Sequence, residues 1–74
     1  MNDDFQIDDK VEIYLDVKFG EKEGWYSGKV IQIEPYSRHR RFYWVELSVD
    51  AQTILGTQRI SVFNPKNIRK WMEE

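Results

Sequence analysis

Hydrophobic and polar residues alternate over several short stretches of this 74-residue chain. A period of two is typical of β-strands with one buried face, and it recurs often enough to predict five of them. No segment repeats apolar residues at helical spacing over three turns, and the chain has no internal repeat. The predicted strands cover residues 10–16, 25–34, 42–49, 58–63 and 68–71.

The alternation is interrupted in the second predicted strand. Gly28 and Val30 share one face, whereas Ile31 and Ile33 share the other. A β-bulge or sharp bend near Val30 would turn both sets toward one core, and Gly28 would let another backbone approach closely. Pro35 should end the strand because it has no N–H to donate. We therefore expect a strongly curved sheet.

The later strands and their connections follow from the same pattern. Residues 17–24 and 50–57 are expected to be connections, since glycine and charged residues interrupt the alternation there. Pro65 at the second position of residues 64–67 favours one tight or 3₁₀ turn. In the fourth strand Ile60 and Val62 should face inward. In the third strand the residues expected to face the core are Tyr43, Val45, Leu47 and Val49.

Five short strands with a short 3₁₀ turn before the last one predict an all-β domain. The architecture that fits is a small five-stranded SH3-like barrel, whose closure removes exposed strand edges. A five-stranded oligonucleotide-binding barrel is the alternative, although it usually needs longer strands. We expect a flexible acidic arm over residues 1–9 and the barrel over residues 10–72.

The composition limits the class of protein. With no Cys and one His, the chain lacks a disulfide framework and the ligands of a structural zinc site. No apolar run is long enough to cross a bilayer. We therefore expect a monomeric domain of a larger protein in the nucleus or cytoplasm, with no cofactor, no metal and no membrane partner.

Charge is unevenly spread along the chain, although the net charge is only −2. Residues 1–27 carry eight acidic and three basic residues, whereas residues 28–74 carry five acidic and eight basic ones. Arginines pair with phosphates while aromatic rings stack on unpaired bases, so a basic turn beside aromatic residues indicates RNA or single-stranded DNA. The candidate contacts in that turn are Arg38, Arg40 and Arg41, next to Tyr36 and Phe42.

Four motifs add a family resemblance, in the order 9–13, 25–30, 42–47 and 67–69. They are a strand opening Asp-Lys-Val-Glu-Ile, an aromatic pair followed by Ser-Gly-Lys-Val, an aromatic strand and a closing Asn-Ile-Arg. In this order and spacing they resemble Tudor and Agenet domains of the Royal superfamily of SH3-like barrels. The resemblance implies recognition of methylated lysine or arginine, as in a histone tail or another methylated protein, by an aromatic cage that attracts the cation.

The resemblance also implies particular contacts. Tyr26 matches a cage aromatic at the start of the second strand, Trp25 lies beside it, and Tyr14 adjoins the cage position at the end of the first. Leu15 and Leu47 stand where the family commonly has further cage residues, so at most a partial cage is implied. The implied ligand-binding residues are Tyr14, Trp25, Tyr26 and Asp50.

Two other functions stay open. Phe42 and Trp44 fall on the face opposite the core residues of the third strand, where they could anchor a protein partner in a barrel without a cage. RNA binding by the basic turn is the other. Catalysis is not expected, because the lone His39 lies in that turn without a partner to orient it.

Overall fold

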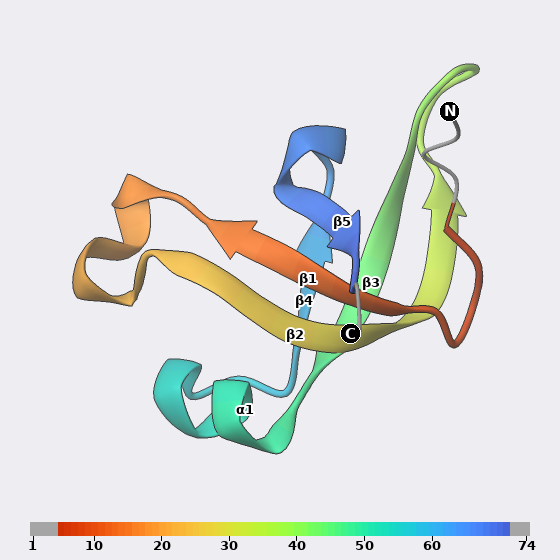
Figure 1. Cartoon of the computed structure of the whole chain (residues 1–74). Coiled ribbons are helices and arrows are strands. Elements are labelled where there is room, and N and C mark those ends of the chain that lie inside the picture. The colour runs from red at the N-terminus through yellow and green to blue at the C-terminus, as the bar shows by residue number, and fades with distance from the viewer. Residues whose placement is uncertain (1–4, 72–74) are drawn as a thin grey trace.

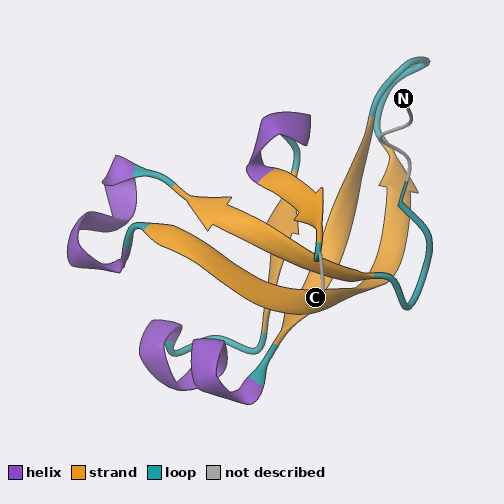
Figure 2. Ribbon diagram, viewed as in Figure 1, coloured by secondary structure: helices purple, strands orange, loops and turns teal. Residues whose placement is uncertain are grey.

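The computed structural model describes residues 5–71 (Figures 1 and 2). This part of the chain forms five strands, one short α-helix and two 3₁₀ helices, and none of its helices has the length and apolar character that a membrane span requires. The elements are β1 (Lys10–Leu15), η1 (Val17–Lys22), β2 (Gly24–Pro35), β3 (Arg41–Leu47), α1 (Val49–Leu55), β4 (Arg59–Val62), η2 (Pro65–Asn67) and β5 (Ile68–Lys70).

The strands form one antiparallel sheet in the order β4-β3-β2-β1-β5. The two terminal strands of the order, β4 and β5, are joined in sequence by η2, as predicted for the turn before the last strand. The all-β prediction is confirmed, and the order is consistent with a small SH3-like barrel. The sheet is not closed, however, because β4 and β5 each pair on one side only within the described residues.

The predicted irregularity in β2 is confirmed. The pairing of β2 with β3 slips by one residue between Val30 and Gln32, which leaves Ile31 as the extra residue of a bulge. Val30 is completely buried, and Ile33 packs against the same core three residues later. A Cβ at Gly28 would lie 2.6 Å from a backbone oxygen of β3, so only glycine allows the two strands to approach this closely.

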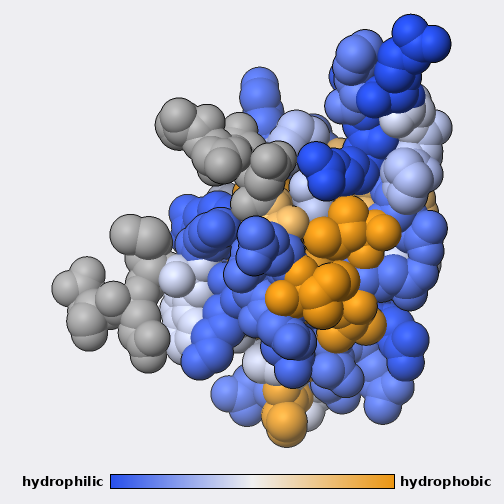
Figure 3. Space-filling view, turned by 90° about the vertical axis from the view of Figure 1, so that its right-hand side faces the viewer, coloured by the Kyte–Doolittle hydropathy of each residue, from blue (hydrophilic) through white to orange (hydrophobic). Residues whose placement is uncertain are grey.

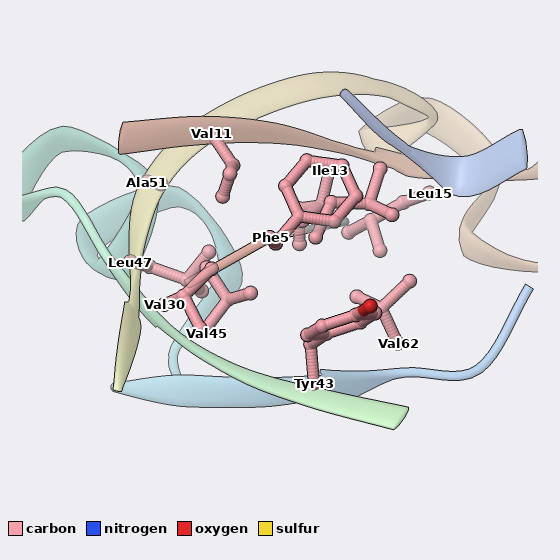
Figure 4. Close-up of a cluster of buried hydrophobic side chains, with 11 residues drawn as sticks. Phe5, Val11, Ile13, Leu15, Val30, Tyr43, Val45, Leu47, Ala51 and Val62 are labelled. Carbon is pink, nitrogen blue, oxygen red and sulfur yellow. The ribbon is translucent and has the colours of Figure 1, made fainter. Parts of the chain in front are cut away.

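The core lies inside this curved sheet (Figure 4). Alternate residues of β1 and β3 point into it, as their sequence pattern predicts, and Val62 of β4 is buried with them. Val49 was expected in the core but is 77% exposed, because the chain leaves β3 at Leu47 and turns into α1. The buried residues are Phe5, Val11, Ile13, Leu15, Val30, Tyr43, Val45, Leu47, Ala51, Val62 and Ile68.

The N-terminal segment is part of the fold over residues 5–9. Phe5 is 6% exposed and meets the ring of Tyr43 edge-on at 5.2 Å. The pairing of β2 with β1 ends at Lys29, and at the next residue the C=O of Val30 accepts from the N–H of Asp8 while its N–H donates to the C=O of Asp9. The prediction of a loose arm is therefore wrong for residues 5–9, and residues 1–4 lie outside the described part.

Helical turns replace two of the predicted connections. Ser48 caps α1 by accepting a hydrogen bond from the N–H of Ala51, and Gly56 ends the helix in the left-handed conformation, φ 73°. A seven-residue helix is too short to be stable alone, so the burial of Ala51 against the core stabilises it. Asp16 likewise caps η1, within the predicted loop before β2.

Candidate functional site

The three aromatic residues of the predicted cage lie on two faces of the sheet. In the pairing of β1 with β2, Tyr14 stands opposite Trp25, and Ile13 stands opposite Tyr26. Successive residues of a strand point to opposite faces, so Tyr14 and Trp25 share the outer face, with ring centroids 5.3 Å apart. Tyr26 packs against the core with Ile13. Tyr26 and Trp25 therefore do not enclose one ligand site.

In the outer-face pair of Tyr14 and Trp25, the ring of Trp25 already contacts a cationic side chain of this chain. The guanidinium carbon of Arg69 lies 3.8 Å from the ring centroid of Trp25, and its Nε donates to Glu12 at 2.8 Å. One face of Trp25 is thus covered by a side chain that an ion pair holds in place. Any methylated lysine or arginine would compete with Arg69 for this face.

Among the other predicted contact residues, the hydroxyls of Tyr14 and Tyr26 already have hydrogen-bond partners. The hydroxyl of Tyr14 donates to the carboxylate of Glu23, and this hydrogen bond, with desolvation and nearby negative charge, raises the pKa of Tyr14. The hydroxyl of Tyr26 donates to the backbone oxygen of Lys22 at 2.7 Å. Asp50 is exposed in the first turn of α1, and its side chain makes no hydrogen bond or ion pair with residues 5–71.

A different set of aromatic residues does come together, on the outer face of β3. Phe42 and Phe63 stack with centroids 4.7 Å apart and an interplanar angle of 28°. The edge of Tyr36 meets Phe63 at 5.5 Å, and Trp44 meets Phe42 at 6.4 Å. We call these four residues the ring cluster. Tyr36 and Phe63 are each about half exposed, so the cluster is open to a partner.

The strand register explains the ring cluster. Tyr43 of β3 pairs with Val62 of β4. Because the two strands are antiparallel, Phe42, which precedes Tyr43, stands opposite Phe63, which follows Val62. Phe42 and Trp44 were recognised from sequence alternation. Phe63 was not, although Ile60 and Val62 were assigned inward in the same strand, and that alternation already places residue 63 outward.

An open groove of about 680 Å³ lies beside the ring cluster and shares Tyr36 and Phe63 with it. Three of its residues are Arg or Lys and one is His, and none of the described lining residues is acidic, in contrast to the net charge of −2. Figure 3 shows that hydrophilic residues gather at the projecting tip of the β2–β3 hairpin. The lining residues are Tyr36, His39, Arg40, Arg41, Tyr43, Phe63, Asn64, Pro65 and Lys66.

The two walls of the groove are short turns held by local hydrogen bonds. In the hairpin turn the N–H of Tyr36 donates to the backbone oxygen of Arg40 at 3.1 Å. On the other side, the side chain of Asn64 caps η2 by accepting from the N–H of Lys66 at 2.9 Å. Arg38 is exposed at the hairpin tip. The structure thus places Arg40 and Lys66, which are distant in sequence, on the same groove.

Comparisons with protein-family models, with curated proteins and with solved structures find no match to this chain. Within residues 5–71, no group of three or more His, Asp or Glu side chains is placed to hold a metal ion. The ring cluster can stack on a planar group, and the basic side chains of the groove can attract negative charge.

Proposed function

We propose that this chain is a non-catalytic binding module that holds single-stranded nucleic acid across the ring cluster and the groove. The observation that carries this proposal is the stacked pair Phe42–Phe63, whose Phe63 is half exposed, beside a groove with basic residues and no acidic residue among the described ones that line it. Stacking of a base on an aromatic ring contributes roughly 1–3 kcal/mol. Contacts from basic residues to phosphates supply the rest of the affinity and make it salt-dependent.

Recognition of a methylated peptide by the predicted cage has less support. Tyr26 lies on the core side of the sheet, and Arg69 covers a face of Trp25. The SH3-like strand order is compatible with a Tudor or Agenet domain, and we retain that assignment as a proposal about ancestry and fold. Under it, the module uses a surface other than the cage.

A protein partner is the second candidate. Phe42 and Trp44 belong to the ring cluster, and clustered aromatic side chains are common anchors of protein interfaces. We favour nucleic acid because the adjoining groove adds the basic side chains of Arg40 and Lys66, and none of its described lining residues is acidic. The proposal includes a monomeric module within a larger protein of the nucleus or cytoplasm, where single-stranded nucleic acid occurs.

The direct test is fluorescence anisotropy with labelled ten-nucleotide oligouridine and oligothymidine and with a duplex of the same length. We expect the single strands to bind more tightly than the duplex. Phe63→Ala should weaken binding about tenfold, since one stacking ring is lost. Trp25→Ala is the matched control, because Trp25 is an exposed aromatic residue outside the ring cluster, and it should bind like wild type.

Peptides complete the experiment. Lysine peptides that differ only in methylation test the cage, and a polyglutamate peptide tests for an acidic protein partner. No binding of either single strand would refute the proposal. Methylation-dependent binding that Trp25→Ala abolishes would restore the cage, and binding of polyglutamate alone would assign the surface to proteins.

A further inference from the structure

Tyr43 belongs to the core and to the groove at once. Its ring is buried beside Val62 and against Phe5 (Figure 4). The residue nevertheless lines the groove together with Arg40 and Lys66. Its hydroxyl has no hydrogen-bond partner within residues 5–71, and no side-chain oxygen or nitrogen of the described residues is both buried and unpartnered. The hydroxyl therefore keeps some accessible surface, and the residue that carries it lines the groove.

The four tyrosines divide by position. Tyr14 and Tyr26 lie outside the groove, and their hydroxyls donate to Glu23 and to the backbone of Lys22. Tyr36 and Tyr43 line the groove, and neither hydroxyl has a partner within the described residues. Tyr36 is half exposed and its hydroxyl can use water, whereas Tyr43 is 9% exposed. A core tyrosine that keeps its hydroxyl at a groove wall is a fixed donor.

We propose that the Tyr43 hydroxyl donates a hydrogen bond to a phosphate oxygen of a single strand bound in the groove, between Arg40 and Lys66. This inference rests on the proposed function. A neutral donor to a charged acceptor makes a strong hydrogen bond. Core packing of the ring holds the donor in place before binding, so little conformational entropy is lost when the bond forms. Arg40 and Lys66 supply charge, and Tyr43 fixes the position of the phosphate.

The test is Tyr43→Phe, which removes one oxygen and leaves the ring contacts with Phe5 and Val62. We expect binding of the labelled oligouridine to weaken about tenfold, the usual effect of losing one hydrogen bond to a charged group. The dependence on salt should not change, because the phenol is neutral. Tyr26→Phe is the matched control: it loses its bond to Lys22, so its melting temperature should fall while its affinity stays that of wild type.

A second measurement identifies the group that the hydroxyl contacts. In NMR titrations, uridine should bind wild type and Tyr43→Phe equally, whereas uridine 5′-monophosphate should bind the variant more weakly. An equal loss for both ligands would overturn the phosphate contact. If wild type binds the oligouridine and Tyr43→Phe binds it as tightly, this inference fails and the proposed function stands. If wild type binds no single strand, both fail.

Discussion

Strand alternation determines whether each aromatic side chain lies on the core face or on the outer face of the sheet. Tyr14 and Tyr26 lie on neighbouring strands, yet the first points outward and the second inward, because their pairing partners are Trp25 and Ile13. Sequence alone already implied that Trp25 and Tyr26 point to opposite faces. It could not show that Arg69, more than forty positions later, would cover Trp25, because that contact depends on the pairing of β5 with β1.

The Tyr14–Glu23 hydrogen bond has a testable pH dependence. It raises the folded-state pKa of Tyr14 above its ordinary value of 10.0. The stabilisation is therefore fully present below pH 10 and is lost as the pH rises through the folded-state pKa. Glu23→Gln removes the charge and should lower the pKa of Tyr14 toward its ordinary value. The measurement is the tyrosinate absorbance titration, with Tyr14→Phe subtracted to isolate this residue; an unchanged titration would show that the bond is absent in solution.

At the scale of elements, the irregular N-terminal segment over residues 5–9 bonds to β2 and packs against the core. The pairing of β2 with β1 ends at Lys29, and the backbone groups of the next residue, Val30, bond to residues 8 and 9. The buried ring of Phe5 adds a hydrophobic contact to these bonds. The bulge in β2 was predictable from the broken alternation, but the packing of residues 5–9 was not, because four aspartates around two apolar residues are typical of a loose arm.

The contribution of the N-terminal segment can be measured with two substitutions. Phe5→Ala should lower the free energy of unfolding by about 3 kcal/mol, since a buried aromatic side chain is removed. Ile7→Ala in the same segment is the control, because Ile7 is 50% exposed and should cost less than about 1 kcal/mol. Urea denaturation monitored by circular dichroism measures both. Equal losses would mean that the segment is not anchored by Phe5.

At the scale of the whole molecule, the location of charge matters more than its sum. The chain carries a net charge of −2, yet none of the described residues that line the groove is acidic. Three acidic residues near the start of the described part pair elsewhere: Asp8 with Lys29, Asp9 with Lys70 and Glu12 with Arg69. An acidic composition is thus compatible with a local site for phosphates.

Two substitutions that each remove one positive charge distinguish an effect of the position of the charge from an effect of the net charge. Arg40→Gln should weaken binding of the labelled oligouridine and reduce the slope of log affinity against log salt by about 1. Arg59→Gln changes the net charge by the same amount, but Arg59 is on β4 outside the groove lining, and its slope should equal that of wild type. The slopes come from anisotropy titrations at several salt concentrations. Equal reductions in both variants would indicate a nonspecific charge effect.

The sequence by itself determined the strands, the bulge, most of the core and the 3₁₀ turn before β5, because these depend on local alternation and on the backbone limits of glycine and proline. It also indicated Phe42 and Trp44 as candidate contacts for a partner, and the basic turn as a candidate contact for nucleic acid. Only the tertiary structure decided which residues meet across the sheet. Register stacks Phe63 on Phe42, η2 places Lys66 on the same groove as Arg40, and α1 is stabilised because Ala51 packs against the core. Such contacts join segments far apart in the chain, and no local pattern encodes them.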